Sequence, residues 1–95
     1  MRLAAKPDSN QKHIVAILRQ CGATVRILAM VGQGVPDLLV SHPLAVPPGQ
    51  NFLLECKMKD GRLTDAERVF FDEWPGQKAI VYCAEDALRV MGLLL

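Results

Sequence analysis

The sequence predicts a single α/β domain, in which helices flank a mixed sheet of four strands in the order α-β-β-β-α-β-α. Two observations predict it. Apolar residues recur at helical spacing in some segments and form short β-branched runs in others, and segments rich in glycine or proline separate them. The 95 residues suffice for one core and contain no internal repeat. We therefore expect one domain over residues 1–95, with a flexible N-terminus over residues 1–7.

The first predicted element is a helix over about residues 9–21. Asp8 and Gln11 have the spacing of a capping box, and apolar residues follow at helical spacing until Gly22. The chain is therefore expected to leave the helix at Gly22 and to enter its first strand.

Two strands are predicted next, over residues 24–30 and 36–40, because both segments are apolar and partly β-branched. Gly32-Gln33-Gly34 between them is too short for a phosphate-binding loop and lacks its Gly-Lys-Ser/Thr ending. We interpret it as a turn that lets backbone or DNA approach closely, which makes the two strands a hairpin.

A third strand is predicted over residues 51–58. It follows a segment over 42–50 that contains three prolines and a glycine and must therefore be a loop. The first three strands are expected to form an antiparallel meander.

The remaining elements are a helix, a fourth strand over 78–82 and a last helix over 84–91. Thr64 and Glu67 have capping-box spacing at the start of the first of these helices, and Pro75-Gly76 ends it. Because a helix precedes the fourth strand, we expect that strand to pair parallel to the third by a right-handed crossover.

Composition narrows the class of protein. A net charge of +1 gives no global field to attract a polyanion, so nucleic-acid binding would depend on local clusters of basic residues. Cys21, Cys56 and Cys83 are odd in number and lie in apolar surroundings, which favours reduced, buried thiols over disulfides or a zinc site. No apolar run reaches 18 residues, and the start does not resemble a signal peptide. We expect a cytoplasmic protein without a membrane partner.

Three charged residues, Asp37, Glu55 and Lys57, lie in or beside the apolar runs of the predicted strands. Asp37 is the only formal charge from Ile27 through Leu54, and a buried charge is costly unless it is paired. Strand side chains alternate, so Glu55 and Lys57 project to the same side, about 6–7 Å apart along the strand. If the strand of Asp37 lies alongside, two carboxylates and an ammonium converge on one point.

Such a convergence is typical of a divalent-metal site. Two close carboxylates repel each other and lose hydration, which a hard cation such as Mg²⁺ or Mn²⁺ offsets. The ion keeps waters and positions for phosphate oxygens, and its bound water is a better nucleophile. We therefore expect Asp37 and Glu55 to be metal ligands, with the backbone carbonyl of Cys56 as a further ligand. Lys57 would orient the attacking water or stabilise charge in the transition state.

Pro36-Asp37 and Glu55-Cys56-Lys57, preceded by a helix and a strand, resemble the motif of PD-(D/E)xK nucleases. The fuller pattern, with residues 34–40 and then Leu63-Thr64 opening a helix, resembles the compact VRR-NUC branch found in phage and bacterial proteins. The resemblance covers about residues 8–88. It implies a restriction-endonuclease-like fold and a Mg²⁺- or Mn²⁺-dependent deoxyribonuclease. As in stand-alone members of that branch, it also implies a homodimer that acts on branched DNA, such as a Holliday junction or a flap.

The chain departs from that family at two places. Relatives commonly have a glutamine on the helix after the ExK strand, where this chain has Glu67. We interpret Glu67 either as a catalytic-site residue that reaches the metal or a water, or as the N3 partner of Thr64 in the cap. Many relatives supply an acidic residue from the first helix, where this chain offers Asp8, Asn10 and Gln11. We expect Asn10 and Gln11 to be capping or surface residues.

Polar and basic residues near the motif are candidates for a phosphate-binding patch. These nucleic-acid-binding candidates are Lys12, Arg26, Gln33, Lys59, Arg62 and Arg68. For each basic residue alone, solvated surface charge is the simpler interpretation. His13 and His42 lack a triad partner, and we expect them to be surface or local hydrogen-bonding residues.

Three functions are compatible with the sequence. The leading one is a Mg²⁺- or Mn²⁺-dependent DNA endonuclease, with Asp37, Glu55, Lys57 and Glu67 as its catalytic residues. The second is a DNA-binding or assembly module that keeps the nuclease fold without cleaving. The third is a plain interaction domain, in which Glu55 and Lys57 form an ion pair on an edge strand; it leaves Asp37 unexplained.

Overall fold

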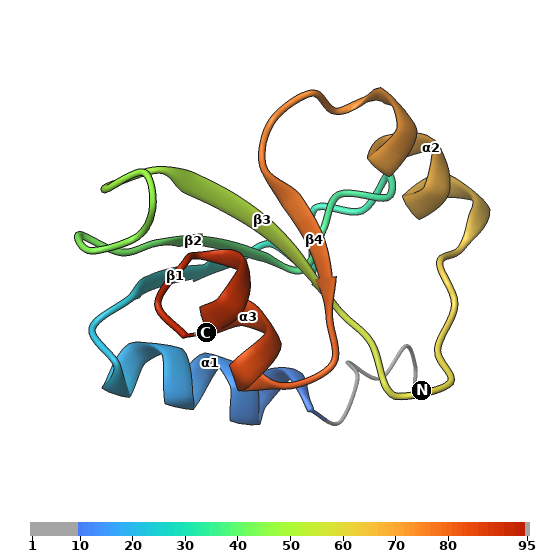
Figure 1. The fold of residues 1–95 in the computed structure, drawn as a ribbon. Coiled ribbons are helices and arrows are strands. Elements are labelled where there is room, and N and C mark those ends of the chain that lie inside the picture. The colour runs from blue at the N-terminus through green and yellow to red at the C-terminus, as the bar shows by residue number, and fades with distance from the viewer. Residues whose placement is uncertain (1–9, 95) are drawn as a thin grey trace.

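The computed structural model describes residues 10–94 and confirms the predicted α/β layout (Figure 1). Three helices and four strands follow in the expected order. The elements are α1 (Gln11–Gln20), β1 (Thr24–Ile27), β2 (Leu38–Ser41), β3 (Asn51–Cys56), α2 (Asp65–Glu73), β4 (Lys78–Val81) and α3 (Ala84–Val90).

The four strands form one sheet in the order β1-β2-β3-β4. β1, β2 and β3 form the predicted antiparallel meander, and β4 pairs parallel to β3. β2 starts two residues later than predicted, at Leu38, and its ladder extends to Ser41. The later start has a local reason, because Pro36 has no backbone N–H to donate. β3 ends at Cys56 rather than Met58, and Lys57 N still donates to Val81 O at 3.0 Å.

One face of the sheet packs against α1 and α3, which lie together on the same side (Figure 1). Alternate residues of the central strands point into this core, among them Val40, Phe52 and Leu54. Each is at most 1 % exposed, and complete burial of such a side chain contributes about 1.5–3 kcal/mol. This face therefore supplies most of the stability of the fold.

Helix α2 stands on the other side of the sheet, and none of its residues is buried (Figure 1). The segment between β1 and β2 reaches up to its first turn. Gly34 has a φ of 78°, and a Cβ there would lie 2.9 Å from Glu67 N and closer still to the Ala66 carbonyl. Only glycine fits this close approach, which confirms the predicted role of the turn in letting backbone come near.

Two helix starts were predicted from capping boxes, and one is confirmed. Thr64 Oγ1 accepts from Glu67 N at 3.2 Å, and Glu67 Oε1 accepts from Thr64 N at 2.9 Å. The other prediction is wrong, because α1 begins at Gln11 with Asn10 as its N-cap residue. Asp8 lies outside the described residues.

The three cysteines are all free thiols, but they differ in burial. Cys56 is buried and Cys83 is partly buried, whereas Cys21 is exposed beside the end of α1, which contradicts the prediction for that residue. His42 is buried and makes local hydrogen bonds: its Nδ1 accepts from Leu44 N at 3.0 Å. Nε2 therefore carries the proton and donates to Cys21 O at 2.8 Å.

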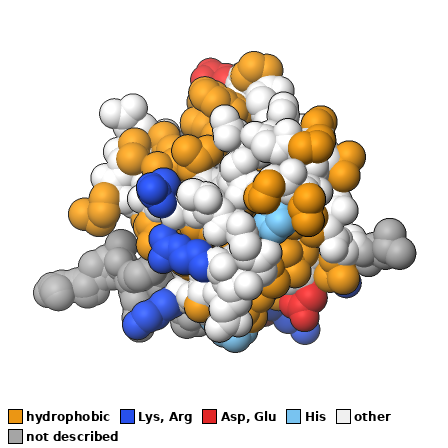
Figure 2. Space-filling view, turned by 90° about the vertical axis from the view of Figure 1, so that its left-hand side faces the viewer, with side chains coloured by type: hydrophobic (Ala, Val, Ile, Leu, Met, Phe, Trp, Pro, Cys, Tyr) orange, Lys and Arg blue, Asp and Glu red, His pale blue; other side chains and the backbone are white. Residues whose placement is uncertain are grey.

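The connection between β2 and β3 lies at the end of the molecule shown in Figure 2. Hydrophobic side chains gather over the upper part of this view, and few acidic ones are visible. Leu44 and Val46 in this connection are 71 % and 67 % exposed. Among residues 10–94, no helix is long and apolar enough to cross a membrane.

Candidate functional site

Strand β3 carries the candidate site on the face opposite the core. Phe52, Leu54 and Cys56 point toward α1 and α3, so Leu53 and Glu55 point to the other side, where α2 stands. Glu55 is only 2 % exposed. A carboxyl group is thus held at a buried position near the C-terminal end of a central strand.

Asp37 comes opposite Glu55 when the register of the two strands is continued. Leu38 pairs with Leu54 in an antiparallel ladder, so the next residue on each strand gives the pair Asp37 and Glu55. Asp37 Oδ2 accepts a hydrogen bond from Cys56 N at 2.9 Å. The Asp37 carboxylate therefore links the two strands just beyond the last backbone pair of the ladder. The predicted alignment of the two acidic residues is therefore present.

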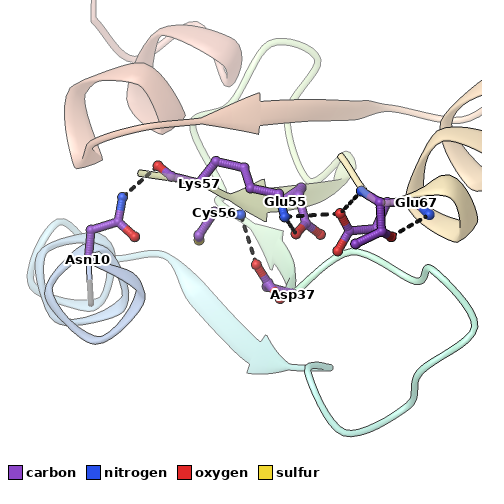
Figure 3. Close-up of polar contacts among 7 residues, drawn as sticks. Asn10, Asp37, Glu55, Cys56, Lys57 and Glu67 are labelled. Carbon is purple, nitrogen blue, oxygen red and sulfur yellow. Dashed lines mark hydrogen bonds and ion pairs between the residues drawn. The ribbon is translucent and has the colours of Figure 1, made fainter. Parts of the chain in front are cut away.

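Lys57 bridges two carboxylates at the same place (Figure 3). Its Nζ lies 3.4 Å from Glu55 Oε2 and 3.0 Å from Glu67 Oε1. The side chain of Lys57 is only 13 % exposed, so these ion pairs are largely shielded from solvent. Glu55 and Lys57 lie on the same side of the chain, as the strand alternation predicted.

Glu67 is the predicted N3 partner of Thr64 in the cap, and it also pairs with Lys57; its contact with a metal or water stays a prediction. Its Oε1 accepts from the Thr64 amide in the helix cap and also pairs with Lys57. The cap fixes the first turn of α2, and Gly34 lets that turn approach the segment that leads into Asp37. The local cap therefore places a second carboxylate beside Lys57.

The electrostatics of the site depend on Glu55. Burial, followed by the negative charges of Asp37 and Glu67, raises the pKa of Glu55 to about 8, against the opposing effect of Lys57. Its Oε1 is buried and has no hydrogen-bond partner among the described residues. At neutral pH this carboxyl group therefore holds a proton unless a further positive charge arrives.

The two charged neighbours of Glu55 are both shifted toward their ionised forms: the pKa of Glu67 is lowered and that of Lys57 is raised. Burial opposes the charge on Glu67, but the Thr64 amide and Lys57 outweigh it and lower the pKa of Glu67. Burial likewise opposes the charge on Lys57, and its contacts with Glu67 and Glu55 outweigh it and raise the pKa of Lys57. The result is a charged Lys57–Glu67 pair beside a protonated Glu55.

The donor set fits a hard divalent cation. A cation beside Glu55 would stabilise its ionised form and provide a partner for the buried oxygen. Residues 10–94 contain no ready group of three His, Cys, Asp or Glu side chains that could hold a metal. A cation held by Asp37 and Glu55 would therefore need waters, backbone oxygens or phosphate oxygens, which Mg²⁺ accepts. The Cys56 carbonyl remains a predicted ligand.

Asn10 was expected to cap α1 or to lie on the surface, and the structure confirms its N-cap position but not a capping role for its side chain. It occupies the N-cap position without a side-chain cap bond. Its Nδ2 instead donates to Lys57 O at 2.9 Å and to Tyr82 O at 3.0 Å. The amide thus ties the start of α1 to the ends of β3 and β4, and its Oδ1 is buried without a partner in the described chain (Figure 3).

Sequence reasoning missed the role of Asn10 because its two partners lie 47 and 72 residues away. No local pattern encodes such a contact. Gln11, also expected to cap or to lie on the surface, is buried at 8 % exposure in the first turn of α1.

The candidate DNA-binding residues are all exposed, but they come from separate elements. Lys12 lies on α1, Arg26 on β1, Gln33 between β1 and β2, Lys59 and Arg62 between β3 and α2, and Arg68 on α2. Within the described part of the chain, none of the five basic ones forms an ion pair. Their charges are therefore available to an anionic partner.

Comparison of the chain with protein-family models, curated proteins and solved structures found no match. The distinguishing feature of the site is a buried carboxyl group on β3, facing a second carboxylate and a lysine that pairs with a third.

Proposed function

We propose that this protein is a Mg²⁺- or Mn²⁺-dependent endonuclease that hydrolyses phosphodiester bonds in DNA. The observation that carries the proposal is the alignment of Asp37 with buried Glu55, with Lys57 held between Glu55 and Glu67. A proton on Glu55 and the nearby Lys57 ammonium relieve the repulsion between the two carboxyl groups, and a divalent cation would take the place of that proton.

Each residue has a distinct role in the proposed reaction. Asp37 and Glu55 would hold the divalent cation, which would make a bound water more acidic and neutralise charge on the phosphate. Lys57 orients the attacking water or stabilises the added negative charge of the transition state. Glu67 positions the Lys57 ammonium, and the Thr64 cap holds Glu67 in turn.

The resemblance to VRR-NUC nucleases supports the same function. The residues that carry it are Pro36-Asp37, directly before the start of β2, and Glu55-Cys56-Lys57, at the end of β3, and α2 follows them along the chain. By this resemblance we propose branched DNA, either a Holliday junction or a flap, as the substrate and a homodimer as the active form. Exposed Lys59, Arg62 and Arg68 follow the site along the chain and would contact the phosphates.

Cleavage of labelled DNA tests the proposal. A panel of Holliday junction, flap, nicked and plain duplex DNA is incubated with Mg²⁺, with Mn²⁺ and with a chelator. We expect metal-dependent cleavage by the wild type and a loss of at least 100-fold in Asp37→Ala and Lys57→Ala, both still folded. Asp65→Asn removes an exposed carboxylate in the first turn of α2 and serves as the matched control. Robust cleavage by Asp37→Ala would refute the assignment.

A second candidate is a non-cleaving DNA-binding or assembly module. The Lys57–Glu67 ion pair beside a protonated Glu55 favours it, because the charges of these groups are then balanced without any metal. Calorimetric titration with Mg²⁺ separates the two functions. Binding at millimolar concentration or tighter, lost in Asp37→Ala, supports the nuclease, whereas no binding supports the module.

A further inference from the structure

A groove of about 870 Å³ lies on the same face of the sheet as Glu55. Leu39 and Leu53 line it from the sheet, and Phe70 and Trp74 line it from α2 and its C-terminal end. The two aromatic rings are stacked, with centroids 5.1 Å apart and planes 16° from parallel. Trp74 is nevertheless 44 % exposed, so this aromatic pair is open to a ligand.

Three residues with amide side chains also line the groove. Gln50, Asn51 and Gln77 contribute both hydrogen-bond donors and acceptors, and in the described part of the chain no charged side chain lines it. An apolar and aromatic interior with a few carboxamides matches the chemistry of a nucleobase, which stacks on its faces and forms hydrogen bonds at its edges.

Positive charge flanks the groove where phosphates would lie. The strand register places Arg26 beside Leu39 and Lys78 beside Leu53 in one row across this face of the sheet. The apolar centre of the row thus has a basic residue at each end, and the Lys78 ammonium donates to the carbonyl of Trp74 at the edge of the groove. This arrangement suits a nucleic-acid strand, whose bases enter the apolar part and whose phosphates meet the cations.

The groove lies on the same face of β3 as the proposed catalytic site, because Leu53 lines it. Leu53 and Glu55 are two residues apart on the same face of β3, which is a distance of about 6–7 Å. DNA bound with one phosphate at Glu55 and Lys57 would therefore bring an adjacent nucleotide to the groove.

We propose that this groove binds an unpaired nucleobase next to the phosphate that is cleaved. The inference rests on the proposed function and narrows its substrate, because a base within a duplex has its faces stacked and its edges paired. DNA with unpaired nucleotides at the branch, such as a flap, is then preferred over a fully paired four-way junction.

Trp74 reports directly on this binding because it is the only tryptophan of the chain. The wild-type protein is titrated in chelator with three probes: a thymidine oligonucleotide, an abasic oligonucleotide of the same length, and a blunt duplex. We expect the thymidine oligonucleotide to quench Trp74 fluorescence and to bind at least fivefold more tightly than the abasic one. The duplex binds without quenching. Absence of quenching by the thymidine oligonucleotide overturns the proposal.

Substitutions then test the aromatic contact. Trp74→Ala is expected to weaken thymidine oligonucleotide binding by about fivefold to a hundredfold, down to the affinity of the abasic probe, and Trp74→Phe to restore most of it. Tyr82→Ala is the matched control, because Tyr82 is also 44 % exposed but does not line the groove. Equal binding by wild type and Trp74→Ala overturns the proposal.

Two further outcomes distinguish the alternatives. If Trp74→Ala converts a dimer to a monomer in sedimentation velocity and leaves the preference for thymidine over abasic probe unchanged, a second copy covers the groove and the proposal fails. The binding assay needs no metal and no cleavage. Quenching in a protein that never cleaves DNA therefore supports base binding in the groove but refutes the proposed nuclease activity. Cleavage without quenching supports the nuclease activity but refutes base binding in the groove.

Discussion

On the face of the sheet that α1 and α3 cover, strand β3 presents Phe52, Leu54 and Cys56, whereas on the opposite face it presents Leu53 and Glu55. The first face is sealed by two helices. The second meets only α2, a helix with no buried residue, and keeps an open groove. Strand β3 therefore stabilises the fold with one set of alternate residues, whereas the other set is available for binding and chemistry.

The largest predicted effect is on stability, and it differs between alanine substitutions at two neighbouring leucines. Leu54→Ala is expected to lower the free energy of unfolding by about 2–5 kcal/mol, because it leaves a cavity in a sealed core. Leu53→Ala should cost only about 1–2 kcal/mol, because the groove that it lines admits water and no sealed cavity forms. Urea denaturation of both variants measures the difference, and equal losses would mean that the two faces are packed alike.

A smaller effect is the pH dependence of stability that Glu55 confers. Its pKa rises from 4.5 to about 8 in the folded protein, so the folded state holds a proton that the unfolded chain releases between these values. The stabilisation that this proton on Glu55 gives the folded protein is complete below about pH 4.5 and is lost as pH rises through about 8. We expect the free energy of unfolding to fall by about 2–4 kcal/mol over this range.

Glu55→Gln tests this assignment, because an amide cannot titrate. Its free energy of unfolding, measured in urea from pH 5 to pH 9, is expected to stay nearly level over the window in which the wild type loses stability. Glu67 shifts in the opposite direction and loses its contribution only at more acidic pH, so it does not obscure the result. An unchanged slope in Glu55→Gln would assign the pH dependence to another group.

The smallest effect concerns the cap that supports the reactive face. Thr64→Ala removes the hydroxyl that accepts from Glu67 N and is expected to cost about 1 kcal/mol of stability. If the proposed function holds, it should also slow cleavage, because the cap positions the Glu67 carboxylate against Lys57. Thr64→Ser, which keeps the hydroxyl, is the control. Full cleavage by Thr64→Ala would show that Lys57 needs no such support.

The sequence alone determined the features that short-range patterns encode. The order of helices and strands follows from periodicity, and the Thr64–Glu67 cap follows from a spacing of three residues. Asp37, Glu55 and Lys57 could be singled out because charge within apolar runs is costly, and strand alternation placed the last two on one side. Their chemical roles remain predictions.

Tertiary structure alone decided how distant segments meet. The contacts of Asn10 with Lys57 and Tyr82, the approach of Gly34 to α2, and the groove between Leu53 and Trp74 all join residues far apart in the chain. Such contacts depend on how helices and strands pack in three dimensions, which spacing along the chain does not encode. The physical reason is that periodicity specifies which face of an element is apolar, whereas packing specifies what that face meets.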